Sequence, residues 1–134
     1  MSSSVYLVLV LSLSLLVTLA STGMPGAPVA ANTGSEEVKN AANFALERFN
    51  LMSTNKHIYK LLTVKSAKTQ VVAGRNYILE IIIGATNCQK NSHYNLQACK
   101  LTLGANAKLQ NCTFEVYVSW NNVMSLSKST CKTL

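Results

Sequence analysis

The first regular pattern of hydrophobic and polar positions lies in residues 33–50, "TGSEEVKNAANFALERFN". Its apolar positions recur at spacings of four, three and four, which is typical of one stripe on a helix. The stripe consists of Val38, Ala42, Ala45 and Phe49, with Leu46 beside it. Thr33 and Glu36 match a capping box, and Glu36 and Glu37 place negative charge where a helix start favours it. The pattern predicts one amphipathic helix of about four turns.

From His57 onward the pattern changes to β-branched and aromatic residues, in "HIYKLLTVKSAKTQVV" and then "NYILEIIIGATNC". The short connection at Ala73-Gly74 predicts an antiparallel hairpin. In the second segment one face is wholly apolar, and we expect the helix to cover it. That face carries Tyr77, Leu79, Ile81 and Ile83, and the opposite face carries Ile78, Glu80 and Ile82.

A second alternating segment, "CTFEVYVSW", places Phe114, Val116 and Val118 on the inner face. A further strand ending near Cys131 would complete a second hairpin through "WNNVM". Between the hairpins, "QKNSHYNLQACKLTLGANAKLQN" has no steady period and predicts an irregular excursion held by disulfides. The expected fold class is α+β, with a single helix packed on a four- to five-stranded antiparallel sheet.

The N-terminal residues 1–20 have the character of a secretory signal peptide. Their apolar run ends at small residues that suit cleavage after Ala20 or after Gly23. The run is shorter than the ~20 residues of a membrane-spanning helix, so we expect no stable membrane anchor after signal removal. The mature domain is then 21–134, beginning with a flexible arm over 21–33 that is rich in Gly, Pro and small residues.

Four cysteines lie in the C-terminal half: Cys88, Cys99, Cys112 and Cys131. An even number in a small secreted domain predicts two disulfides. Three pairings are possible, and pairing of neighbours is the simplest for successive antiparallel strands. The competing use of four cysteines is a zinc site, which we do not expect, because the chain has no C-x2-C pair and the compartment is oxidising.

Twelve Lys and Arg residues against five acids give a formal net charge of +7. Such a surface suits an acidic partner. The basic residues are spread along the chain without a dense run, so the sequence predicts a soluble cationic face and no nucleic-acid partner.

The chain offers few side chains for catalysis, since it contains no Asp and only two His residues. Cys88 with His93 is the nearest approach to a nucleophile and base, but a disulfide would remove the thiolate. Glu80 and Glu115 lie on the polar side of strands, where carboxylates facing lysines are ordinary. No metal, phosphate or cofactor motif is present, so we expect no cofactor and no enzyme.

The segment "QVVAG", Gln70 to Gly74, resembles the Gln-x-Val-x-Gly hairpin of the cystatins, inhibitors of papain-like cysteine proteases. Other features resemble the secreted, two-disulfide members over essentially the entire mature chain. In order along the chain they are Gly26 in "PGAPV", the helix ending "ERFN", "LQAC" around Cys99, "CTFEVY" and Trp120.

This resemblance implies a secreted, reversible, tight-binding inhibitor of papain and the cathepsins. Three pieces would fill the protease cleft: the arm around Gly26, the first hairpin tip and the second tip at Trp120. The implied protease-binding residues are Gly26, Gln70, Val71, Val72, Ala73, Gly74 and Trp120. It also implies that the four cysteines pair in sequence, and that the protein is mainly a monomer, with a domain-swapped dimer possible.

The chain departs from the family pattern at the second hairpin. Ser119 stands where the family has Pro before the Trp, and the separation between Cys112 and Trp120 is one residue shorter. Ser53-Thr54-Asn55 replaces the Ser-Asn-Asp stretch that some members use against legumain, so we do not expect that activity. The glycosylation pattern at Asn111 has a disulfide cysteine in its middle, and we expect it to be unused.

An alternative function comes from a different class. The +7 charge also suits a non-inhibitory, cationic binding module with the same fold, either cathelin-like or antimicrobial and binding to anionic surfaces. Only "KTL" follows Cys131, which argues against a cathelin-like pro-peptide.

Overall fold

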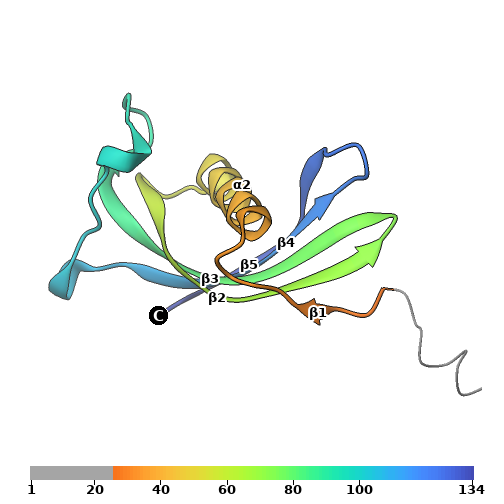
Figure 1. Cartoon of the computed structure of the whole chain (residues 1–134). Helices are drawn as coiled ribbons and strands as arrows, with labels where there is room; N and C mark the ends of the chain where they lie inside the picture. The colour runs from red at the N-terminus through yellow and green to blue at the C-terminus, as the bar shows by residue number, and fades with distance from the viewer. Residues whose placement is uncertain (1–25) are drawn as a thin grey trace, which may run out of the picture.

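The computed structural model describes residues 26–134, so the predicted signal peptide and the first five residues of the arm lie outside it. One α-helix crosses a five-stranded antiparallel sheet of order β1-β2-β3-β4-β5 (Figure 1). The elements are β1 Val29–Ala30, α2 Glu36–Met52, β2 His57–Val72, β3 Gly74–Gln89, β4 Leu109–Val118 and β5 Met124–Thr133. The predicted α+β class is confirmed. Among the described residues no helix has the length and apolar character needed to cross a membrane.

Helix α2 begins two residues later than a capping box at Thr33 would place it. Ser35 is the N-cap, and its side-chain oxygen accepts a hydrogen bond from the backbone N–H of Val38. The predicted Thr33–Glu36 box is therefore wrong. Asn32 Oδ1 instead accepts from the N–H of Gly34, which forms a turn over residues 32–34 before the helix begins.

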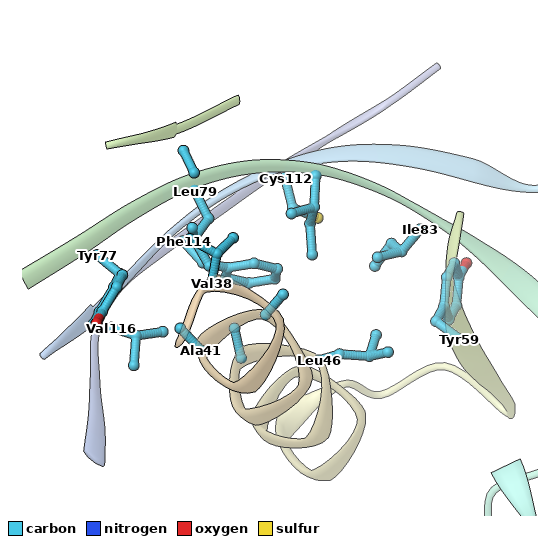
Figure 2. Packing of buried hydrophobic residues seen from close by; sticks show 14 of the residues in the cluster. Val38, Ala41, Leu46, Tyr59, Tyr77, Leu79, Ile83, Cys112, Phe114 and Val116 are labelled. Carbon is cyan, nitrogen blue, oxygen red and sulfur yellow. The ribbon is translucent and has the colours of Figure 1, made fainter. Parts of the chain in front are cut away.

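The core lies between α2 and the concave face of the sheet, as expected (Figure 2). Val38, Ala41 and Leu46 of the helix belong to one buried cluster with Leu79 and Phe114 of the sheet, and all five are at most 2% exposed. The predicted alternation is confirmed, because the apolar face of β3 and the inner positions of β4 are buried or packed against the core. These positions are Tyr77, Leu79, Ile81, Ile83, Phe114, Val116 and Val118.

One buried polar residue of the helix was missed by the hydrophobic pattern. Asn50 is 7% exposed, and its side chain bonds both backbone groups of Tyr59 at 2.9 Å, donating to the C=O and accepting from the N–H. Phe49 packs edge-on against the Tyr59 ring, with centroids 5.4 Å apart. The end of α2 is thereby fixed to the start of β2.

The disulfides pair neighbouring cysteines, Cys88 with Cys99 and Cys112 with Cys131. The first closes the excursion between β3 and β4, which holds two short 3-10 turns, Leu96–Ala98 and Gly104–Asn106. The second joins β4 to β5 directly across the ladder. Because all four cysteine sulfurs are in disulfides, Cys88 cannot act as a nucleophile activated by His93, and no thiolate is available to bind zinc.

Candidate functional site: an apolar edge built from three segments

The first hairpin tip is a tight turn between two long strands. Strands β2 and β3 have 16 residues each, and pairing continues to Val72 opposite Gly74, so that Ala73 alone forms the turn. Gly74 has a φ of 118°, a conformation that side chains strongly disfavour. Val71 and Val72 are 58% and 45% exposed. The sequence of this segment therefore places two valines in solvent at a rigid point.

Tyr117 on the neighbouring strand β4 braces this turn. Its hydroxyl donates a hydrogen bond to the backbone carbonyl of Ala73. The space beside Gly74 is also closed, because a Cβ built there would lie 2.6 Å from the carbonyl oxygen of Val118 and 2.8 Å from Tyr117 Oη. Glycine is thus required at position 74 both for its conformation and for this close approach.

The N-terminal segment lies beside the first tip. Residues 29–30 form β1, in which Val29 pairs with Thr69 and Ala30 with Lys68 on β2. This pairing adds a two-residue edge strand within the segment 21–33 that was predicted to be a flexible arm. The strand was missed because two residues between prolines and glycines give no periodic signal.

Gly26 reaches the first tip itself. It has a φ of 96°, and a Cβ built there would lie 3.4 Å from the carbonyl oxygen of Val71. Val29, three residues on, is 60% exposed. The N-terminal segment therefore runs alongside the tip and adds apolar surface to it.

The second hairpin tip carries Trp120, which is 87% exposed. Its turn is closed by Ser119, whose N–H donates to the carbonyl of Val123 at 3.0 Å and whose Oγ accepts from the N–H of Val123 at 3.0 Å. Asn122 takes a positive φ of 65°. Proline at position 119 would lack that N–H, so the serine holds this shorter turn by means that the family's usual residue does not have.

The three segments share one end of the sheet. The first tip leads into β3 at Arg75, which pairs with Val118 of β4, and the second turn follows directly after Val118. Figure 1 places both hairpin tips and the N-terminal segment on the same side of the molecule. We call this surface the apolar edge. Its exposed members are Val29, Val71, Val72, Trp120 and Val123, with Gly26 and Gly74 between them.

Sequence reasoning missed three residues that build this edge. Tyr117 was not singled out within its alternating segment, Val29 was assigned only to an arm, and Val123 only to a turn. An apolar residue between "NN" and the next strand was the available signal for Val123, which is 59% exposed.

Glu80 and Glu115, interpreted from the sequence as ordinary strand carboxylates facing lysines, each lie near a lysine in the structure. Glu80 lies 3.5 Å from Lys65 Nζ, and Glu115 lies 3.8 Å from Lys128 Nζ. The hydrogen bond from the Asn111 amide, with the charge of Lys65, lowers the pKa of Glu80 from its ordinary value of 4.5. Both pairs lie on the sheet's outer face, so they present no paired carboxylates in a cleft.

Two further predictions concern Asn55 and Asn111, whose positions the structure gives. Asn55 lies in the connection between α2 and β2, where its N–H donates to Ser53 Oγ. Asn111 lies within β4, between β3 and β5, and its amide is bonded to Glu80. The absence of legumain inhibition and an unused glycosylation pattern at Asn111 remain predictions.

Comparison with known proteins agrees with this architecture. A family model described as "Cystatin domain" matches residues 26–121. Cystatin-C of Saimiri sciureus is 38% identical over 109 residues, covering 80% of this chain and 74% of the relative. Cystatin-C of Homo sapiens is 34% identical over 135 residues, covering 94% of this chain and 92% of the relative.

Among solved structures, dimeric human cystatin F superposes with a TM-score of 0.75 at 29% identity, covering 84% of this chain and 90% of that one. Al-CPI superposes with a TM-score of 0.71 at 31% identity, covering 81% of this chain and 100% of that one. The fold and the edge define a small disulfide-bonded domain with two exposed hairpin tips at one end of its sheet. The chain belongs to the cystatin family, as a two-disulfide (type 2) member, and this membership indicates a cysteine protease inhibitor rather than an enzyme.

Proposed function

We propose that this protein is a secreted, reversible, tight-binding inhibitor of papain-like cysteine proteases, with papain and the cathepsins as targets. The apolar edge enters the active-site cleft, with Gly26 and the N-terminal segment on one side of the catalytic cysteine and Trp120 on the other. The observation that carries the proposal is the convergence of three exposed apolar segments on one rigid edge.

The energetics favour this mode of binding. Burying Val71 or Val72 fully contributes roughly 1.5–3 kcal/mol each, and tryptophan is among the commonest hot-spot residues of interfaces. The tips are held by strand pairing and by the Tyr117 bond, so little conformational entropy is lost on docking.

The geometry of the first tip also disfavours cleavage. Attack on the Ala73–Gly74 bond would need its carbonyl to rest in the protease's oxyanion hole. That carbonyl already accepts the Tyr117 hydroxyl, and the positive φ of Gly74 takes the chain away from an extended substrate conformation. The tip therefore occludes the cleft without acting as a substrate.

Secretion and oligomeric state complete the proposal. The two disulfides are of the kind found in oxidising compartments, which supports an extracellular location after signal cleavage. We expect mainly a monomer, with exchange of the long first hairpin between two copies as the route to a dimer.

Titration of active papain with the mature protein tests the proposal. We expect sub-micromolar, reversible inhibition that is lost in Gly74→Trp, because the added ring meets Val118 and Tyr117 and blunts the tip. Deletion through Gly26 should also weaken it. The matched control is Gly104→Trp, which replaces another glycine of positive φ where no atom lies within 4 Å. Undiminished papain activity, together with salt-sensitive binding to anionic vesicles, would instead support the cationic module.

A further inference from the structure

The end of the molecule away from the apolar edge carries a group of basic side chains that we call the distal basic patch: Lys56, His57, Lys100 and Lys108. All four are exposed. Strand β2 runs from His57 to the first tip over 16 residues, so the patch lies roughly 50 Å from that tip along the strand. Figure 1 shows the excursion that carries Lys100 and Lys108 on the opposite side of the molecule from the tips.

Backbone hydrogen bonds fix two of these lysines on strand β3. The N–H of Ala85 donates to the carbonyl of Lys108 at 3.0 Å, and the N–H of Asn87 donates to the carbonyl of Lys100 at 2.9 Å. Their attachment points are two residues apart, which is roughly 7 Å along a strand. Since the Cys88–Cys99 disulfide closes the same segment, the backbone spacing of these cations is set before any ligand arrives.

Lys56 is held on the other side of β3. Its carbonyl accepts from the N–H of Lys90 at 2.8 Å, and His57 pairs with Gln89. A hollow of about 290 Å³ brings Lys56, His57 and Lys108 together over Ala85. Lys56, His57 and Lys108 therefore share one hollow, and the backbone of Lys100 is bonded to β3 two residues further along, at Asn87.

The surface around Lys56, His57 and Lys108 is recessed and polar. A second hollow of about 590 Å³ shares His57 and Lys108 with the first. Hydroxyl and amide side chains line the two hollows: Thr54, Asn55, Thr102 and Asn106. Such walls offer hydrogen bonds to a hydroxylated ligand in addition to charge.

No side-chain carboxylate balances this charge within residues 26–134. The two salt bridges there join Lys65 to Glu80 and Lys128 to Glu115, in the middle of the sheet. Glu36 and Glu37 lie in the first turn of α2, and Glu47 lines a different cavity with Lys60 and Lys90. The patch is thus a local excess of positive charge that attracts polyanions at low and physiological salt.

We propose that the distal basic patch binds a sulfated glycosaminoglycan. A linear chain of sulfates, carboxylates and hydroxyls matches fixed, spaced cations with polar hollows between them. An anionic bilayer fits less well, because the large exposed apolar side chains of the excursion do not line these hollows: Leu103 is 79% exposed and lies outside both, and Tyr94 and Leu96 line a different cavity. Binding at this end leaves the apolar edge free, so a matrix-held molecule still presents its tips. This inference rests on the patch alone and not on the proposed inhibition.

The test is binding of the full mature chain to heparin by surface plasmon resonance over a range of salt. The patch variant is Lys100→Gln/Lys108→Gln, and the control is Lys39→Gln/Lys68→Gln, which removes the same charge from exposed positions elsewhere. We expect the patch variant to lose roughly tenfold or more in affinity and to show a shallower salt dependence. The control should stay within about twofold of the parent. Thermal unfolding verifies that both variants fold.

Three outcomes would overturn the proposal. Equal weakening by both variants would mean that net charge alone drives the interaction. Unchanged binding to desulfated heparin would remove the role of sulfate. Binding to phosphatidylserine vesicles without binding to heparin would assign the patch to membranes.

Discussion

The hydroxyl of Tyr117 donates a hydrogen bond to the carbonyl of Ala73, which joins β4 to the turn of the neighbouring hairpin. We expect Tyr117→Phe to keep the fold, with a loss of stability of about 0.5–1.5 kcal/mol for a single hydrogen bond. Papain inhibition should weaken by roughly three- to tenfold, mainly through faster dissociation, because the tip is less well held. Stopped-flow measurement of both rate constants checks this.

The control for that variant is Tyr94→Phe, which removes the hydroxyl of a tyrosine that is 45% exposed in the excursion. It should leave both rate constants for papain unchanged. If Tyr117→Phe behaves in the same way as Tyr94→Phe, the brace has no part in holding the tip.

Gly74→Ala tests the close contact at the tip by adding the smallest possible side chain. Its methyl group would lie 2.6 Å from the Val118 carbonyl in a backbone with φ of 118°. We expect a loss of roughly 1–3 kcal/mol in the free energy of unfolding, measured by urea denaturation. Gly104→Ala, with φ of 75° and open space around it, separates the two causes because it carries the conformational strain alone. Equal losses in both variants would show that the contact with Val118 costs nothing.

Asn50 is expected to be a large contributor to stability. Asn50→Ala would leave the backbone N–H and C=O of Tyr59 without their partners inside the core. Each unsatisfied buried group costs about 1–3 kcal/mol, so we expect a loss of several kcal/mol in urea denaturation. The exposed Asn43 on the same helix provides the control, and Asn43→Ala should change stability by less than about 0.5 kcal/mol. A small effect at Asn50 would mean that water replaces the lost bonds.

Glu80 makes stability depend on acid pH. Its folded pKa lies below 4.5, chiefly because of the Asn111 amide and then Lys65. The folded state therefore favours the carboxylate, and this stabilisation is present above the ordinary pKa and lost as the pH falls through the folded pKa. Glu80→Gln should flatten the decline of unfolding free energy below pH 4.5.

The two partners of Glu80 give the matched comparison. Asn111→Ala and Lys65→Ala should each reduce the acid dependence, since the amide is the largest single cause of the lowered pKa and the charge and hydrogen bond of Lys65 lower it as well. The same slope in Glu80→Gln and the parent would contradict this assignment.

Much of the fold was predictable because the relevant signals are periodic. The stripe from Val38 to Phe49 and the alternation from Tyr77 to Ile83 each repeat one period over several residues, so single exceptions do not hide them. The helix start was not predictable, because Thr33 and Ser35 are both good caps and the choice depends on the turn at Asn32. Asn50 was missed because its partners belong to a strand nine residues away in the chain.

The two hairpin tips of the candidate site were predictable from the sequence, whereas the residue that supports the first tip was not. "QVVAG" ends in a glycine, which a tight turn selects, and Trp120 lies in the connection between β4 and β5, so both lie at hairpin tips. Tyr117 lies outside both tip sequences, and its role arises only when β4 lies beside the first hairpin. Such cross-strand contacts depend on register, which local sequence does not specify.

The central claim is that one rigid apolar edge makes contact with the protease, and amide hydrogen exchange of the papain complex tests it most directly. Comparing free and bound inhibitor, we expect slower exchange in residues 26–30, 70–75 and 118–124, and unchanged exchange in the excursion at 96–106. A complex in which those three segments exchange as in the free protein, with protection appearing elsewhere, would contradict the account.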